Sequence, residues 1–206
     1  MTAPVGVILA GGLSRRMGGG DKGLLDLGGR SILSRVIDRL SPQVGAVALN
    51  ANGDPARFAD LGLPVVADSV EGFAGPLAGV LAGLDWAAGQ GAEAIVTAAA
   101  DTPFFPTDLV ARLTKAARGM EHPLVLAATP DPEGGTIRHP TFGLWPVALR
   151  DDLRAALQGG LRKVVLWTDA HRGREALFPV AGVDPFFNVN TPQDLARAEI
   201  LLKGGA

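Results

Sequence analysis

A glycine-rich segment follows the first apolar run of the chain, and it limits the possible folds more than any other feature. The run Val5–Ala10 has the composition of a buried strand, and Leu9–Gly23 then reads LAGGLSRRMGGGDKG. Nine of the 28 glycines lie within the first 29 residues. Gly11 and Gly12 lack a Cβ, so backbone N–H groups there can approach a ligand closely. This pattern predicts a strand, a ligand-binding loop and then a helix.

Cations accompany these glycines. Arg15, Arg16 and Lys22 place positive charge in a loop at the carboxyl end of a strand, which favours binding of a polyphosphate. The loop is not a Walker A motif, because Asp21 precedes Lys22 and Gly23 follows it. The pattern G-x-G-x-x-G in residues 18–23 begins too far beyond the strand to be a dinucleotide fingerprint.

Apolar runs alternate with helix-like stretches along the first 129 residues. This alternation predicts βαβ units and a mainly parallel sheet, hence an α/β fold. The expected strands are Val5–Ala10, Val44–Leu49, Pro64–Ala67, Ala94–Ala100 and Leu124–Ala128, and the expected helices are Ile32–Leu40 (capped by Ser31), Pro55–Leu61, Pro76–Ala88 and a helix from Thr107 as its cap to Arg118.

The pattern changes after about residue 130. The run His139–Trp145 predicts a strand that returns antiparallel, and short strands are expected at Leu177–Val180 and Phe187–Val189. Helices are expected at Asp151–Leu157, Lys163–Asp169 and Thr191–Leu202. With no repeat and no linker, residues 1–206 are expected to form one domain whose second half begins near residue 130. Trp86, Trp145 and Trp167 are expected to be packing residues.

Composition excludes several classes of function. The chain has 206 residues, no cysteine and a formal net charge of -2. Disulfides, iron–sulfur clusters, cysteine-bound zinc and a thiol nucleophile are therefore excluded, and a nucleic-acid surface is not expected. No apolar run has the ~18 residues of a membrane span. A secretory signal requires basic residues before its apolar run, and none precedes Val5–Ala10. A cytoplasmic protein is therefore expected.

Asp101 is the strongest candidate for a metal ligand. It follows the apolar run Ala94–Ala100, and Pro103 ends the strand just beyond it. Ligands of open α/β sheets bind at the carboxyl ends of the strands. A carboxylate beside a polyphosphate loop suits Mg²⁺, which takes one or two carboxylates together with phosphate oxygens and water.

The motif LAGG-x-S-x-RMGG-x-DK-G resembles the signature of the molybdenum cofactor guanylyltransferases, within the wider nucleotidyltransferase superfamily. The resemblance continues through LNAN around Asn50, ADS around Asp68, GPLAG, DTP, HPT and NVNTP, and so covers most of the chain. It implies a Rossmann-like fold, with a mainly parallel sheet, an antiparallel portion and helices on both faces. It also implies an enzyme that joins GMP from GTP to the terminal phosphate of molybdopterin and releases pyrophosphate. Residues 1–129 would form its nucleotide-binding half and residues 130–206 its acceptor-binding half.

The same resemblance implies roles for individual residues. The nucleotide would be bound by Leu9, Ala10, Gly11, Gly12, Lys22, Asn50, Asp68 and Asp101. Lys22, Arg15 and Asp101 would be catalytic, with the two cations opposing phosphate charge and Asp101 holding Mg²⁺. Asn188 and Asn190 flank Val189 and would point the same way from an extended segment, toward the acceptor or the metal. Thr191 and Pro192 suit the start of the last helix, which leaves both asparagines available.

Several alternatives remain at this point. A cytidylyl-transferring relative or a sugar- or alditol-phosphate nucleotidyltransferase would share the loop, and so would a non-catalytic GTP-binding partner of molybdoenzymes. Molybdoenzymes and other cofactor-biosynthesis proteins are possible partners of the enzyme. His139 lies in the HPT motif, but a structural role is at least as well supported, and no other histidine is a candidate base.

Overall fold

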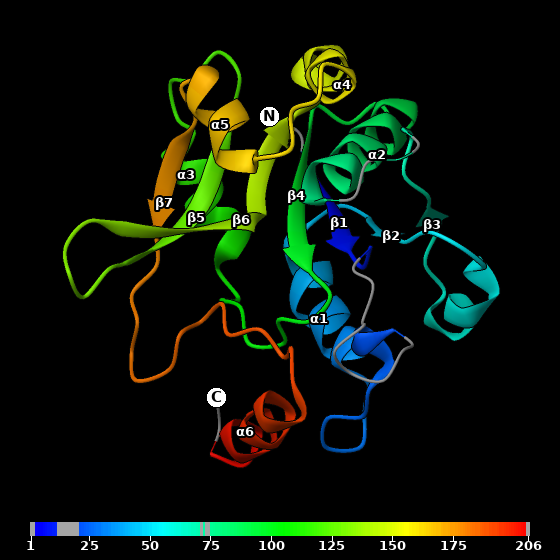
Figure 1. Ribbon diagram of the computed structural model, residues 1–206, viewed down its shortest axis with the longest axis vertical. Helices are drawn as coiled ribbons and strands as arrows, with labels where there is room; N and C mark the ends of the chain where they lie inside the picture. Colours follow the sequence, from blue (N-terminus) through cyan, green and yellow to red (C-terminus); the bar gives the residue numbers. More distant parts are fainter. Residues whose placement is uncertain (1–2, 12–20, 71, 73–74, 205–206) are drawn as a thin grey trace.

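The computed structural model of the chain describes residues 3–11, 21–70, 72 and 75–204. Among these residues, seven strands form one sheet in the order β3-β2-β1-β4-β6-β5-β7 (Figure 1). The strands are β1 (Val5–Leu9), β2 (Val47–Asn50), β3 (Val65–Val66), β4 (Ala94–Ala99), β5 (Val125–Pro130), β6 (Thr136–Pro146) and β7 (Arg174–Leu177).

One strand runs against the others. β6 pairs antiparallel with β4 on one side and with β5 on the other, whereas the remaining pairs are parallel. The expected α/β architecture, with a mainly parallel sheet and an antiparallel portion, is therefore confirmed.

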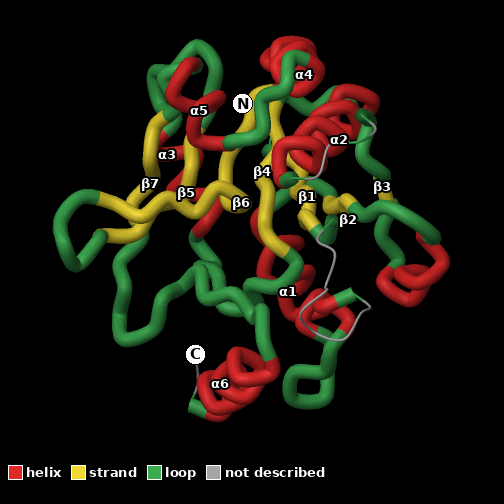
Figure 2. The backbone as a smooth tube through the Cα atoms, viewed as in Figure 1, coloured by secondary structure: helices red, strands yellow, loops and turns green. Residues whose placement is uncertain are grey.

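Helices cover both faces of the sheet (Figure 2). They are α1 (Ile32–Leu40), α2 (Pro76–Gly89), α3 (Leu109–Ala116), α4 (Arg150–Gln158), α5 (Val164–Ala170) and α6 (Pro192–Lys203), with short 3₁₀ turns η2 (Lys22–Leu24), η3 (Ser41–Gln43), η4 (Pro55–Leu61) and η5 (Val147–Leu149). None of the described helices is long and apolar enough to cross a membrane.

Alternation along the strands gives each face its own apolar core. Ile8 packs with α1 and α3 on one face, while Val7 packs with α2, α4 and α5 on the other. Trp145 and Trp167 are buried in this second core, as expected of packing residues. A smaller cluster joins α6 to the start of α1 through Leu27, Ile32 and Ala198. The C-terminal helix is thereby held beside the segment that follows the glycine-rich loop.

Most expected elements are present with shifted ends, and three expectations were wrong. β7 ends at Leu177, and Val180 lies in the following loop. Phe187–Val189 forms no strand: Val189 N donates instead to Asp101 O at 2.8 Å. Helix α3 begins at Leu109 with Asp108 at its cap position, so Thr107 is not its cap.

Candidate active site

The carboxyl ends of four neighbouring parallel strands lie level with one another. Leu9 of β1 is in register with Asn50 of β2 on one side and with Ala99 of β4 on the other, and Asn50 pairs with Val66 of β3. Parallel strands in register bring the residues that follow them to one edge of the sheet. Asp68 and Asp101 therefore flank the point where β1 leads into the glycine-rich loop.

Asp101 lies in the turn after β4 and is partly buried. Burial raises the pKa of its carboxyl group, because desolvation disfavours the charged form, while the positive charge of Lys22 opposes that shift. The Thr102 hydroxyl, 3.3 Å from Asp101 Oδ1, also lowers the pKa. Lys22 and Thr102 offset the effect of burial on the pKa only in part. The negative charge of the carboxylate is therefore incompletely neutralised, and a further cation would stabilise it.

Lys22 begins the η2 turn and faces the C-terminal segment. Its Nζ donates to Asn190 Oδ1 at 2.8 Å, across 168 residues of sequence. Asn188 Oδ1 accepts a hydrogen bond from Thr102 Oγ1. Both asparagines therefore contact neighbours of Asp101, and their expected role toward the acceptor or the metal stays a prediction. Thr191 caps α6 in a reciprocal box with Asp194, as expected, and the side chains of both asparagines take no part in that box.

A second polar group lies on the other side of β1. Asn50 is 2% exposed, and its Nδ2 donates to Asp68 Oδ1 at 3.0 Å and to Val66 O at 3.2 Å. Its carboxamide fills the space that a side chain at Gly79 of α2 would occupy, since a Cβ there would lie 2.2 Å from Asn50 Oδ1. Asn52 forms two hydrogen bonds with Asp68: its Nδ2 donates to Asp68 Oδ2 at 2.8 Å, and its Oδ1 accepts from the Asp68 backbone N–H at 2.9 Å.

The residues of this edge fit a single-carboxylate metal site better than a protein cage. No group of three or more His, Asp or Glu side chains suited to a metal occurs among the described residues. Mg²⁺ needs only one or two carboxylates when phosphate oxygens and water complete its shell. Asp101, partly buried and incompletely neutralised, matches that requirement.

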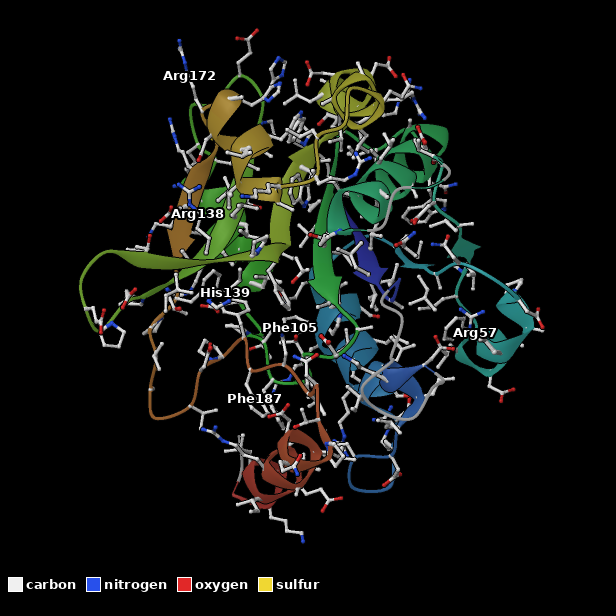
Figure 3. All side chains as sticks on the ribbon, viewed as in Figure 1. Arg57, Phe105, Arg138, His139, Arg172 and Phe187 are labelled. Atoms are coloured by element: carbon white, nitrogen blue, oxygen red, sulfur yellow. The ribbon has the colours of Figure 1, made fainter. Side chains whose placement is uncertain are left out.

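The sequence-predicted residues fall into three groups. Leu9, Ala10, Gly11, Lys22, Asn50, Asp68, Asp101, Asn188 and Asn190 gather at this edge of the sheet. Gly12 and Arg15 lie outside the described residues. His139 lies elsewhere: its Nε2 is 2.9 Å from Thr129 Oγ1, its ring stacks on Phe186, and burial lowers its pKa. Figure 3 shows it separated from Arg57 across the width of the sheet.

Sequence reasoning missed Asn52, Thr102 and Arg57. Asn52 and Thr102 each lie within two residues of a predicted site residue, so strand-end position was the available signal. Arg57 carried no signal, because an arginine in a short polar helix is usually solvated. Its ion pair with Asp21, 36 positions away in the sequence, forms only once the chain has folded.

Solved structures of similar fold include two with nearly complete coverage of the chain. A molybdopterin-guanine dinucleotide biosynthesis protein A from Archaeoglobus fulgidus is 24% identical, covers 97% of this chain and 99% of its own, and has a TM-score of 0.71. A putative glucose-1-phosphate thymidylyltransferase from Bacillus anthracis is 14% identical, with coverage of 97% and 95% and a TM-score of 0.73. At these identities both likenesses concern the fold alone.

Sequence comparison defines the family. Residues 6–173 match the model of the MobA-like NTP transferase domain. Proteins named molybdenum cofactor guanylyltransferase from Bradyrhizobium sp. and Mesorhizobium japonicum are each 54% identical over 203 residues, covering 97% and 96% of this chain and 93% and 95% of their own. The chain belongs to the MobA-like NTP transferase family and, within it, to the molybdenum cofactor guanylyltransferases.

Proposed function

We propose that the protein transfers GMP from GTP to the terminal phosphate of molybdopterin, forming molybdopterin guanine dinucleotide and releasing pyrophosphate. Relatives of more than 50% identity over nearly the whole chain carry this activity in their name. The observation that carries the proposal is the convergence of Lys22, Asp101 and Asn190 beside the end of β1, at the edge where α/β sheets bind nucleotides.

We assign the nucleotide to the strand ends of residues 1–129. Its triphosphate would lie along the loop from Leu9 to Lys22, including Ala10, Gly11, Gly12 and Arg15. The guanine would lie toward Asp68, whose two oxygens are held by the carboxamides of Asn50 and Asn52 and are thereby fixed in orientation. A carboxylate accepts well from the N1–H and N2–H₂ edge of guanine.

The chemistry requires positioning rather than proton removal. A phosphate oxygen of molybdopterin forms a bond to the α-phosphorus of GTP, and the bond from that phosphorus to the oxygen bridging to the β-phosphate breaks. Because the nucleophile is already an anion, no general base is needed. Lys22, held by Asn190, would place its ammonium charge against the departing pyrophosphate.

Asp101 would hold Mg²⁺, which when bound neutralises charge on the phosphate oxygens. Asn190 and Asn188 would hold Lys22 and Thr102 in place around it, and could meet the acceptor phosphate from the half formed by residues 130–206. A cytoplasmic location and contacts with molybdoenzymes or other cofactor-biosynthesis proteins stay predictions.

Transfer of a radioactive label tests this proposal. With GTP labelled at the α-phosphate, Mg²⁺ and molybdopterin, the label should appear in a pterin dinucleotide that a phosphodiesterase cleaves to GMP. The same experiment with CTP labelled at the α-phosphate is the control for base choice. Preferential transfer from CTP, or label remaining in nucleotide alone, would contradict the proposal.

A further inference from the structure

Arg57 uses its whole guanidinium group to join two separate parts of the candidate site. Its Nε donates to Asp21 Oδ2 at 2.6 Å, one terminal nitrogen to Asp54 O at 2.6 Å, and the other to Asn52 O at 2.5 Å. The group also lies over the Phe58 ring, 4.5 Å from its centroid. Figure 3 shows Arg57 on the η4 segment, at the β3 side of the sheet.

Each anchor of Arg57 is attached to a residue of the site. Asp21 directly precedes Lys22, whose ammonium reaches Asn190. Asn52 holds both the backbone N–H and one carboxylate oxygen of Asp68. A continuous chain of hydrogen bonds and peptide units therefore runs from Lys22 through Arg57 to Asp68.

Local geometry holds the guanidinium in this position. Phe58, 2% exposed, gives it a fixed surface to lie on. Gly53, with φ +84°, turns the chain so closely that a Cβ there would lie 3.2 Å from an Arg57 terminal nitrogen. A planar group with three directed donors can meet all three acceptors at once, which a lysine ammonium cannot do in the same geometry.

The contacts of Arg57 with Asp21, Asp54 and Asn52, here called the Arg57 bridge, are not placed to stabilise the fold as a whole. The side chains of Arg57 and Asp21 are 30% and 23% exposed, and partly solvated ion pairs contribute little to global stability. What the bridge does constrain is the distance between two short segments, η2 with Lys22 and the turn after β2 with Asn52.

We propose that Arg57 is a positioning residue that holds the Lys22 segment and the Asp68 segment at the separation required by one nucleotide. The proposal rests on the proposed function, in which Lys22 meets the phosphates and Asp68 meets the guanine. GTP gains from being bound at both ends together, because the second contact is then intramolecular and its geometry is already set. Guanosine or pyrophosphate alone needs only one end and gains nothing from the bridge.

Hydrogen–deuterium exchange without any ligand tests the bridge itself. Arg57→Ala should speed amide exchange in residues 21–25 as well as in residues 51–57, and Asp21→Asn should do the same in both segments. Arg112→Ala is the matched control: Arg112 Nε pairs with Asp108 Oδ2 at 2.6 Å and its guanidinium lies over Phe178, away from this edge. Faster exchange confined to the segment that carries the substitution would overturn the proposal.

Binding constants and turnover test the consequence. In Arg57→Ala the Kd and KM of GTP should rise about tenfold while kcat changes less than about threefold, because uniform binding is lost. The inhibition constants of guanosine and pyrophosphate should stay within about twofold of wild type, since each fragment needs one segment only. Arg57→Lys can keep only the ion pair with Asp21, so its Kd for GTP should lie between those of wild type and Arg57→Ala. Equal weakening of GTP and both fragments, or an unchanged Kd for GTP, would overturn it.

The outcomes separate this proposal from the proposed function. If exchange is coupled across both segments but wild-type protein releases no pyrophosphate from GTP and molybdopterin, the bridge stands and the assigned reaction fails. If wild type transfers GMP but exchange is not coupled, the reaction stands and Arg57 is an ordinary surface residue.

Discussion

Gly79→Ala should damage nucleotide binding through a residue that the substitution does not remove. Gly79 lies in α2, and an alanine Cβ there would be 2.2 Å from Asn50 Oδ1 and 2.9 Å from a methyl of Leu9. Ordinary contact begins at 3.4 Å, so the Asn50 carboxamide must move by more than about 1 Å. Its bonds to Asp68, at 3.0 Å, and to Val66 O, at 3.2 Å, cannot survive that movement.

The expected free-energy changes oppose one another. Alanine is a better helix former than glycine by about 1 kcal/mol. Two lost hydrogen bonds of a buried carboxamide cost about 1 kcal/mol each, and overpacking costs roughly 1–3 kcal/mol more. The net loss of about 2–4 kcal/mol should lower Tm by roughly 4–16 °C in a chain of this size. With Asp68 no longer held by Asn50, the Kd of GTP should rise by about tenfold or more.

Isothermal titration with GTP and Mg²⁺ measures this effect, and two glycines of the same helix supply controls. Gly83→Ala would place its Cβ 2.8 Å from a methyl of Val7, so it should lower Tm without changing the Kd of GTP. Gly89→Ala meets nothing within 4 Å and should change neither quantity by much. A wild-type Kd in Gly79→Ala, or equal weakening in Gly83→Ala, would refute the reasoning.

Two further substitutions test the site, and a third tests a residue outside it. Asp101→Asn should lower turnover by about 10²-fold or more, because it removes the proposed metal ligand. The same substitution should raise Tm at pH 7. Burial raises the pKa of Asp101, so its buried charge destabilises the fold at any pH above that pKa. This gain in Tm should shrink as the pH falls through the raised pKa, where wild type becomes neutral too; a gain that grows toward low pH would be contrary. Lys22→Ala should lower turnover by about 10²-fold, measured by pyrophosphate release, and near-wild-type turnover would remove Lys22 from the mechanism. His139→Ala should lose its bond to Thr129 and its stacking on Phe186, and so lower stability by about 1–3 kcal/mol in a denaturant titration while the Kd of GTP stays unchanged.

Local patterns predicted the elements that carry strong signals. The apolar run before Asp101 became β4, the capped apolar face from Ile32 became α1 with Ser31 accepting from Ser34 N, and Thr191 begins α6. These features depend on neighbours within a few residues. The strand predicted at Phe187–Val189 is absent because of a long-range hydrogen bond: the Val189 N–H donates to Asp101 O and not to a neighbouring strand.

The strand-end residues of the candidate site could be predicted from the sequence, but the hydrogen bonds that join its distant segments could not. Asn50, Asp68 and Asp101 follow apolar runs, and the rule for parallel sheets brings them to one edge. The bond from Lys22 to Asn190 joins residues 168 positions apart, and that from Arg57 to Asp21 spans 36. No spacing rule predicts such pairs, because they exist only once α6 and η4 have docked.

The central claim, guanylyl transfer to molybdopterin, is tested most directly by pyrophosphate release. Wild-type protein with Mg²⁺ should release one pyrophosphate for each molybdopterin consumed when GTP is supplied, and almost none when either substrate is left out. GTP should support this release far better than CTP, UTP or ATP at the same concentration. Release that needs no molybdopterin, or that another nucleotide supports equally well, would contradict the claim.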